Sequence, residues 1–271
     1  MSVRQGQRGR HDRSTRTAVT RAFAAPGRGR WLRRCLVAVL AVAVVVGAAT
    51  GLLLAATPSA ADAEVRTHRL AASRGVLDDG APVPSTFATA LIATEDSRFL
   101  DDPGIDLRGV LRAAGEGLGV PGAAGGATLE QQLAKLLYFD GQRTTVDQVE
   151  EVALAPKLDA AWSKPEILQM YAVTAYFGHD AYGLDAASCR YFGVPPAALD
   201  WDRASLLAGL VQAPTDYDPY LHPDLARARQ AHVLDRLVAT GAITRERADA
   251  ARAAPWNLRD PGGSASTVCR G

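Results

Sequence analysis

Three observations predict an all-α fold behind a single transmembrane helix. Residues 35–56 form an uncharged apolar run that is long enough, at about 1.5 Å per residue, to cross a hydrocarbon core of about 30 Å. Further along the chain, Thr145 with Gln148 and Ser163 with Glu166 form capping boxes, each ahead of a segment with helical apolar spacing. Strand signals are scarce, so we expect no long parallel sheet.

The charge distribution around the apolar run indicates a membrane anchor. Residues 1–34 carry ten Arg and one Asp, whereas the rest of the chain has a net charge of −8. A basic tail can face nucleic acid or a membrane surface, and the adjacent apolar run favours the membrane, so no nucleic-acid partner is predicted. The positive-inside rule then keeps the tail in the cytoplasm and places the following residues outside.

A cleaved signal peptide is the alternative to an uncleaved anchor, because "PSAADA" offers small residues to a peptidase. The apolar run is longer than the usual h-region of about 7–15 residues, which favours the anchor. The domain organisation that we predict is a basic cytoplasmic tail, an anchor, a linker, a helical domain and a disordered tail, over residues 1–34, 35–56, 57–64, 65–255 and 256–271.

The cysteines and the first helix of the domain give weaker signals. Cys189 and Cys269 would both lie outside the membrane, where a disulfide can persist. They are far apart in sequence, so we favour a small buried thiol at Cys189 and an unpaired Cys269, with a bridge as the alternative. Ser85 is expected to cap the helix that contains "TFATALIATED".

The stretch "GGATLEQQLAK" at residues 125–135 predicts a capped amphipathic helix. Thr128 can cap a helix that begins at Leu129, and the leucines lie on one arc of the helical wheel. The opposite arc carries four polar side chains, namely Thr128, Gln131, Gln132 and Lys135. A helix N-terminus after Gly125 and Gly126 could bind an anion such as a phosphate. An ordinary helix with a solvated face is the alternative.

Two pairs of acidic residues are candidates for catalysis. Glu95 and Asp96 end an apolar helix and are followed by Phe99, and a carboxylate beside an apolar wall can act as a base. The alternative is a solvated helix end. Glu150 and Glu151 are neighbours on a helix, about 100° apart, so at most one of them can point into a given cleft.

The order of these segments resembles the peptidoglycan glycosyltransferase family, whose domain occurs alone in monofunctional transglycosylases and also in class A penicillin-binding proteins. "EDSRF" (95–99) and "PGID" (103–106) resemble its motif Glu-Asp-x-x-Phe-x-x-His-x-Gly, and "GGATLEQQLAK" resembles Gly-Gly-Ser-Thr-x-x-Gln-Gln-x-x-Lys. "SKPEILQMY" (163–171) resembles Ser-Lys-x-x-Ile-Leu-x-x-Tyr, and "YFG", "YGLDAASCRYFG" and "ASLLAGLVQAP" follow in family order. The resemblance covers about residues 65–255.

The resemblance implies a two-lobed, lysozyme-like helical fold and the polymerisation of lipid II into glycan strands at the outer face of the cytoplasmic membrane. Glu95 matches the general base, and Glu151 matches a second glutamate that assists at the diphosphate. The substrate-binding positions implied in this way are Asp96, Phe99, Gly126, Thr128, Gln131, Gln132, Lys135 and Lys164, with Arg143 as a substitute cation. A divalent cation such as magnesium is left open, as are cell-wall synthesis proteins as partners.

The chain also departs from the family pattern. Asp102 stands where the first motif has His, and Ala127 where the second has Ser. Asp147 and Gln148 replace the Arg and Lys of the third motif, and Val173 replaces an Asn. The implied diphosphate site has therefore lost two cations, each of which can form charged hydrogen bonds of about 1.5–3 kcal/mol.

Two further functions remain open beside an active polymerase. The first is a catalytically degenerate relative that binds lipid II or cell-wall partners without turnover. The second is a lysozyme-like glycan hydrolase, since such a fold can place a Glu in a glycan cleft. The amphipathic segment around residues 107–118 is expected to touch the membrane.

Overall fold

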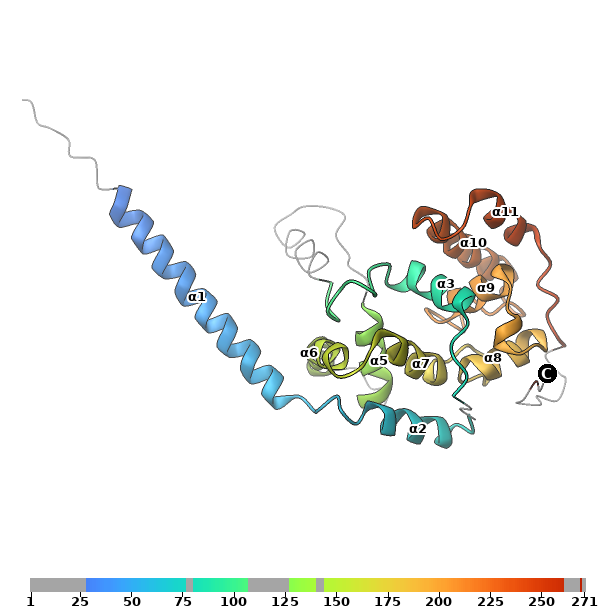
Figure 1. Ribbon diagram of the computed structural model, residues 1–271, viewed down its shortest axis with the longest axis horizontal. Coiled ribbons are helices and arrows are strands. Elements are labelled where there is room, and N and C mark those ends of the chain that lie inside the picture. Colours follow the sequence, from blue (N-terminus) through green and yellow to red (C-terminus); the bar gives the residue numbers. More distant parts are fainter. Residues whose placement is uncertain (1–27, 77–79, 107–126, 140–143, 261–268, 270–271) are drawn as a thin grey trace, which may run out of the picture. The chain divides into compact units, whose positions relative to one another are not determined.

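The computed structural model describes residues 28–76, 80–106, 127–139, 144–260 and 269, and their regular secondary structure is helical (Figure 1). The ranges described contain no strand, and the extended pairing within them is one isolated bridge between Tyr176 and Tyr182. The prediction of an all-α fold is therefore confirmed. The amphipathic segment at 107–118 lies outside the described residues.

The first helix, α1, spans Arg28–Ala56. Its portion Arg30–Ala56 is long and apolar enough to cross a membrane, and none of its apolar window is buried. The helix begins before the predicted start at residue 35, so that it also includes Arg30, Arg33 and Arg34. Residues 1–51 form one compact unit and residues 52–271 a second, which contains the predicted catalytic residues.

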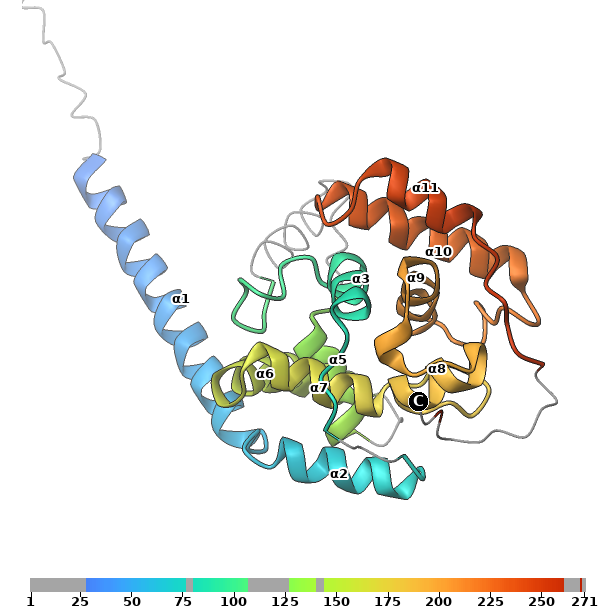
Figure 2. The same cartoon turned by 45° about the vertical axis from the view of Figure 1, so that its right-hand side comes forward.

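The helices of the second unit pack in two groups (Figures 1 and 2). The first group comprises α2 (Ala63–Ser73), α5 (Leu129–Tyr138), α6 (Thr145–Ala161) and α7 (Lys164–Thr174). The second comprises α3 (Ser85–Glu95), α9 (Trp201–Leu210), α10 (Pro223–Ala239) and α11 (Arg245–Ala253). Helix α8 (Leu184–Phe192) contacts both α7 and α9, and the short 3-10 helix η1 (Pro196–Ala198) contacts α8. These groups form the two lobes that were predicted.

One continuous apolar core joins the two groups. Phe87 and Leu91 of α3 and Leu129 and Leu133 of α5 are all fully buried in it. The Phe87 ring also packs against Phe177, with ring centroids 6.0 Å apart. Burial of each large apolar side chain contributes about 1.5–3 kcal/mol, so this core fixes the end of α3 against α5.

Helix starts follow the capping rules, with two shifts from the predicted positions. The box of Ser163 and Glu166 is confirmed, because Glu166 Oε2 accepts a hydrogen bond of 2.7 Å from the Ser163 backbone N–H. The predicted cap at Ser85 is wrong: Ser85 is already the first helical residue and Pro84 precedes it as the N-cap. Proline in extended geometry can occupy that position, although it supplies no side-chain acceptor.

The second shift lies at the start of α6. Its capping box uses Thr144 and Asp147 rather than Thr145 and Gln148. Asp147 Oδ2 accepts a hydrogen bond of 2.7 Å from the Thr144 N–H, and the Thr144 hydroxyl accepts one of 3.2 Å from the Asp147 N–H. The sequence contains two adjacent threonines, and an Asp at the third helical position serves as well as the Gln one residue later.

The segment that follows α1 is held by side chains of the first group. Lys157 Nζ donates to the Thr57 carbonyl and hydroxyl at 2.9 and 2.8 Å, and Trp162 Nε1 donates to the Ala60 carbonyl at 2.8 Å. Thr57 and Ala60 are both buried. The linker predicted at residues 57–64 is therefore docked on α6 over its first part, and α2 begins at Ala63.

The C-terminal segment also returns to the domain. Cys189 and Cys269 form a disulfide, so the expectation that Cys189 would be a free buried thiol is wrong. Between them, the Arg259 N–H donates to the Tyr191 carbonyl at 2.8 Å, and Trp256 is buried rather than part of a disordered tail. The sequence separation of 80 residues hid this pairing, because spacing alone cannot reveal which distant segments meet.

Candidate active site

Glu95 ends α3 at a point where side chains from three other helices meet. Its Oε1 atom pairs with Arg229 Nη2 of α10 at 2.6 Å, and its Oε2 atom accepts a hydrogen bond of 3.2 Å from Gln132 Nε2 of α5. Gln132 Oε1 in turn accepts a bond of 2.9 Å from the Tyr171 hydroxyl of α7. The side chains of Glu95 and Arg229 are 11% and 10% exposed, so this pair is largely shielded from water.

Sequence reasoning missed Arg229. A largely buried carboxylate needs a cation or several donors, but α10 carries Arg227, Arg229 and Arg236, and spacing alone does not say which of them reaches α3. Arg229 Nε donates to the Gly209 carbonyl of α9 at 3.2 Å. A Cβ atom at Gly209 would come within 3.0 Å of Arg229 Cγ, so this glycine makes room for the arginine.

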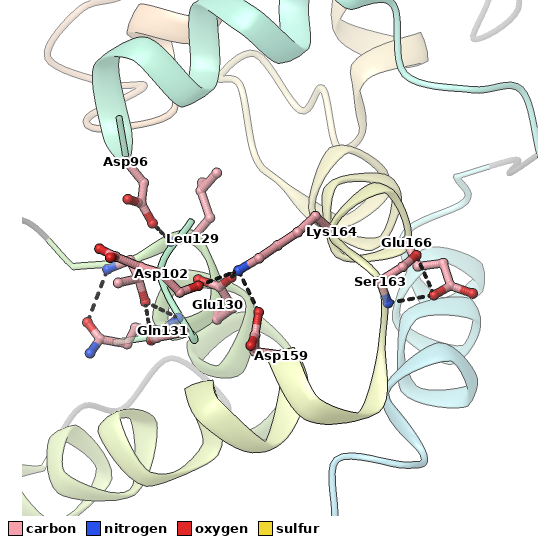
Figure 3. A network of polar contacts seen from close by, with 11 residues as sticks. Asp96, Asp102, Leu129, Glu130, Gln131, Asp159, Ser163, Lys164 and Glu166 are labelled. Carbon is pink, nitrogen blue, oxygen red and sulfur yellow. Dashed lines mark hydrogen bonds and ion pairs between the residues drawn. The ribbon is translucent and has the colours of Figure 1, made fainter. Parts of the chain in front are cut away.

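The N-terminus of α5 is satisfied by the chain itself. Thr128 Oγ1 accepts a hydrogen bond from the Gln131 N–H at 3.2 Å and donates one to the Gly104 carbonyl at 2.9 Å. Gln131 Oε1 accepts a hydrogen bond of 3.2 Å from the Thr128 N–H. Asp96 Oδ2 accepts a hydrogen bond of 3.1 Å from the Leu129 N–H (Figure 3). The predicted cap is confirmed, but Thr128 is 2% exposed and does not belong to a solvated polar face.

Asp96 therefore occupies the position at which a phosphate was expected to meet the helix N-terminus. Burial raises the pKa of Asp96, and the hydrogen bonds that its carboxylate accepts from backbone N–H groups, that of Leu129 first, offset the rise only in part. The helical periodicity of α5 alone does not reveal this anion, because Asp96 comes from the segment that follows α3.

Lys164 connects three segments below the α5 N-terminus (Figure 3). Its Nζ atom contacts Glu130 Oε1 at 2.7 Å, Asp159 Oδ1 at 2.5 Å and the Asp102 carbonyl at 2.8 Å, and it lies 4.6 Å from the centre of the Phe99 ring. Glu130 is 1% exposed and Phe99 is fully buried. Lys164 and Phe99, which were expected to bind substrate, thus lie in a partly buried network of contacts within the chain, and their part in substrate binding stays a prediction.

The electrostatics of this network agree with its geometry. Burial raises the pKa of the Glu130 carboxyl, although the Lys164 ammonium opposes the rise. Burial alone would lower the pKa of Lys164, but its hydrogen bonds with Asp159 and Glu130 outweigh that effect and raise the pKa. Sequence reasoning missed Glu130, because a glutamate in the first turn of a helix is ordinarily a solvated residue that favours the helix dipole.

Asp102 stands at the position where the family has His, and its carboxylate is paired. Asp102 Oδ2 accepts a hydrogen bond of 3.1 Å from Arg98 Nε, and Arg98 Nη2 also pairs with Asp106. The loop after α3 therefore contains its own ion-pair network in place of the family's imidazole.

The remaining predicted residues lie on α5 and α6 or outside the described ranges. Glu151 is 4% exposed on α6, which packs on α5, and Lys135 is exposed one turn beyond Gln132. That Glu95 and Glu151 face one groove stays a prediction. Gly126 and Arg143 lie outside the described residues. Over the part of the chain that the structure describes, no group of three or more His, Cys, Asp or Glu side chains is arranged to hold a metal ion.

Comparison with known proteins identifies a matching family and similar sequences. The family model described as Transglycosylase matches residues 65–238. Penicillin-binding protein 1A of Escherichia coli K12 is 38% identical over 171 residues, which cover 63% of this chain and 20% of that protein. A protein of Cupriavidus necator named as a transglycosylase is 35% identical over 177 residues, which cover 65% of this chain and 77% of that protein.

A crystal structure of penicillin-binding protein 1A from Haemophilus influenzae matches with a TM-score of 0.40 and 20% identity, over 68% of this chain and 18% of that chain. The chain spans only about a fifth of the length of the penicillin-binding proteins that it matches. The family match covers well over half of the chain, and it includes α3, α5, α6, α7 and the whole environment of Glu95. The chain belongs to the transglycosylase family.

Proposed function

We propose that this protein is a membrane-anchored peptidoglycan glycosyltransferase that polymerises lipid II into glycan strands. Family membership supports a glycosyl transfer reaction. The observation that carries the proposal for this chain is the Glu95 carboxylate, which is largely buried and held by one donor on each oxygen. The contacts with Arg229 and Gln132 hold the carboxylate in one orientation, which a general base requires in order to meet the proton it accepts.

In this proposal Glu95 accepts the proton of the 4-hydroxyl group of the acceptor sugar. The hydroxyl oxygen forms a bond to C1 of the donor sugar while the bond from C1 to the lipid pyrophosphate breaks, so that the configuration at C1 is inverted. The pyrophosphate leaves with the electron pair of the broken bond and carries negative charge. Cations and amide donors near that position would stabilise the transition state.

The proposed diphosphate site uses a smaller set of residues than the sequence predicted. Gln132, Lys135, Glu151 and Arg143 remain candidates for contact with the donor or with a cation that accompanies it. Asp96, Thr128, Gln131, Phe99 and Lys164 instead support the site, because their contacts within the chain occupy them. Lys135 is exposed and lies on the same helix as Gln132, which supports our placement of the donor diphosphate beside that part of α5.

The proposed location follows from α1. The apolar helix α1, preceded by the arginine-rich tail, would hold the domain at the outer face of the cytoplasmic membrane with the N-terminus in the cytoplasm. A lipid-linked donor and a growing glycan strand would then meet the enzyme at one surface. Cell-wall synthesis proteins are proposed partners at the same surface.

The experiment that tests this proposal uses the purified full-length protein in detergent with labelled lipid II, with and without magnesium, and separates the products on a gel. The expected product is glycan polymer that is absent with Glu95→Gln and retained with Glu150→Gln as the matched control. Lipid II binding without polymer would instead support the degenerate relative. Shortening of a preformed glycan strand would support a hydrolase.

A further inference from the structure

We propose that Arg229 is a positioning residue for the reaction: it fixes the orientation in which the Glu95 carboxylate receives a proton. This inference rests on the proposed function. Its basis is the pairing of Arg229 Nη2 with Glu95 Oε1 at 2.6 Å, from a helix that lies 134 residues further along the chain. Such a charge-assisted bond is shorter and stronger than a neutral one, so it can hold a carboxylate in one rotamer.

The second carboxylate oxygen is fixed by a separate chain of contacts. Burial raises the pKa of the Tyr171 phenol, and the charge of Glu95 adds to the rise, so the Tyr171 hydroxyl keeps its proton and donates to Gln132 Oε1. The Gln132 amide can then present only its NH₂ group to Glu95 Oε2. Arg229 therefore holds one oxygen of the Glu95 carboxylate and Gln132 holds the other.

These two donors leave room for a substrate. Each oxygen of an ionised carboxylate has about two acceptor sites, and the structure assigns one donor to each oxygen of Glu95. Among the residues that the structure describes, one acceptor site on each oxygen therefore remains for a sugar hydroxyl. Because a misplacement of about 1 Å can cost about a hundredfold in rate, the carboxylate must stay where these donors hold it.

Arg229 is itself held in place. Its Nε atom donates to the Gly209 carbonyl, its side chain is largely buried, and Gly209 leaves the space that the aliphatic stem needs. A guanidinium group can bond the Gly209 carbonyl and the Glu95 carboxylate at once through its planar fork, whereas a lysine ammonium on a flexible stem does not reproduce that geometry.

A purely structural role is the competing account, and α10 provides a matched control for it. Arg236 Nε donates to the Ala93 carbonyl of α3 at 3.1 Å, so Arg236 also joins α10 to α3. No described contact links Arg236 to the Glu95 carboxylate. Loss of either arginine removes one α10–α3 contact, but only loss of Arg229 releases the carboxylate.

The test compares Arg229→Met, Arg229→Lys and Arg236→Met in the full-length protein, with kcat, KM and the thermal midpoint measured for each. For Arg229→Met we expect kcat to fall at least about tenfold with KM within about twofold, since the released carboxylate is misplaced while binding is kept. Arg229→Lys is expected to be intermediate, and added guanidinium is expected to restore part of the Arg229→Met rate. Arg236→Met is expected to lower the thermal midpoint similarly and to keep kcat within about twofold.

An unchanged kcat in folded Arg229→Met, while the wild type polymerises lipid II, would overturn this inference and leave the proposed function intact. Parallel losses of kcat in Arg229→Met and Arg236→Met that follow the loss of folded protein would also overturn it. A folded wild type that makes no polymer would overturn the proposed function, and the inference would fall with it.

Discussion

Glu95 and Glu151 are the two glutamates of the proposed reaction, and their surroundings differ. Around Glu95, at the end of α3, the family's Glu, Asp and paired glutamines are present, and the carboxylate is contacted by Gln132 of α5 and Arg229 of α10. On the helix of Glu151, the family's two cations are replaced by Asp147 and Gln148. In the proposed reaction, the acid–base half of the site therefore keeps the residues that the family motifs have, whereas the proposed diphosphate half differs from them.

The first turn of α6 explains in physical terms why an aspartate suits position 147. Asp147 accepts the Thr144 N–H and thereby caps α6, so it contributes to the start of the helix that carries Glu151. A carboxylate suits that position because of the partial positive charge of the helix N-terminus. A helix start can therefore gain a cap at a position where the family motif has a cation.

The largest expected effect separates the two glutamates directly. Glu95→Gln should lower kcat by about a hundredfold to ten-thousandfold, because it removes the proton acceptor. Glu151→Gln should act more on KM for lipid II, since we place Glu151 at the diphosphate. Steady-state kinetics on labelled lipid II measure both. Equal losses of kcat in the two variants would end the division into an acid–base half and a diphosphate half.

The next effect concerns the network that supports both halves. Lys164→Met should lower the free energy of unfolding by about 3–5 kcal/mol, because it leaves the buried Glu130 carboxylate without its cation. Lys157→Met is the matched control, since Lys157 also has three hydrogen-bond contacts but none with a carboxylate. Denaturant unfolding measures the difference. A smaller loss of unfolding free energy for Lys164→Met than for Lys157→Met would show that the Lys164 network does not stabilise the fold more than an ordinary set of hydrogen bonds.

The same lysine predicts a pH dependence of stability. The pKa of Lys164 in the folded protein lies above the ordinary value of 10.5, since its bonds to Asp159 and Glu130 outweigh burial. Its contribution to the free energy of unfolding is therefore complete below pH 10.5 and is lost as the pH rises through the folded pKa. Lys164→Arg should remove that part of the alkaline decline. Superimposable alkaline stability curves for wild type and Lys164→Arg would contradict this assignment.

Restoring the two missing cations tests the proposed diphosphate half of the site by a gain of lipid II binding. Asp147→Arg combined with Gln148→Lys restores the family's two cations, and we expect lipid II to bind at least about tenfold more tightly, since even one charged contact of about 1.5 kcal/mol corresponds to about tenfold in affinity. Asp147→Ala with Gln148→Ala controls for the loss of the cap. Binding that is equally weak in both double variants would argue against a diphosphate at the start of α6.

The smallest effect concerns the α5 N-terminus. Thr128→Ala should lower the free energy of unfolding by about 1 kcal/mol, the usual cost of losing a cap, and leave KM unchanged. Thr128 is buried and bonded to Gly104, so it supports the helix. A tenfold rise in KM with normal stability would instead return Thr128 to the substrate-binding set.

The sequence predicted the helices and the family motifs. Both could be predicted because the spacing of apolar residues and the capping residues act locally. Ser163 with Glu166 and the cap at Thr128 were predictable for this reason. The contacts that define the site are long-range. Arg229 reaches Glu95 across 134 residues, and Cys269 reaches Cys189 across 80, and no local pattern encodes either meeting.

The same limit applies to Thr128 and Lys164, whose proposed roles changed once their contacts within the chain were known. Thr128 lies on the polar arc of an isolated helix, but the Asp96 and Gly104 segment covers it in the folded chain. Lys164 matches a family motif, but only the fold shows that it meets Glu130, a residue whose burial its own sequence neighbours do not indicate.

The central claim is that the carboxylate of Glu95, held by Arg229 and Gln132, is the base of a glycan polymerase. The most direct measurement is the initial rate of polymer formation from labelled lipid II by the purified wild-type chain, beside an equally folded Glu95→Gln. The account predicts glycan strands from the wild type and none above background from the variant. Strands of equal yield from both proteins, or none from a wild type that binds lipid II, would contradict it.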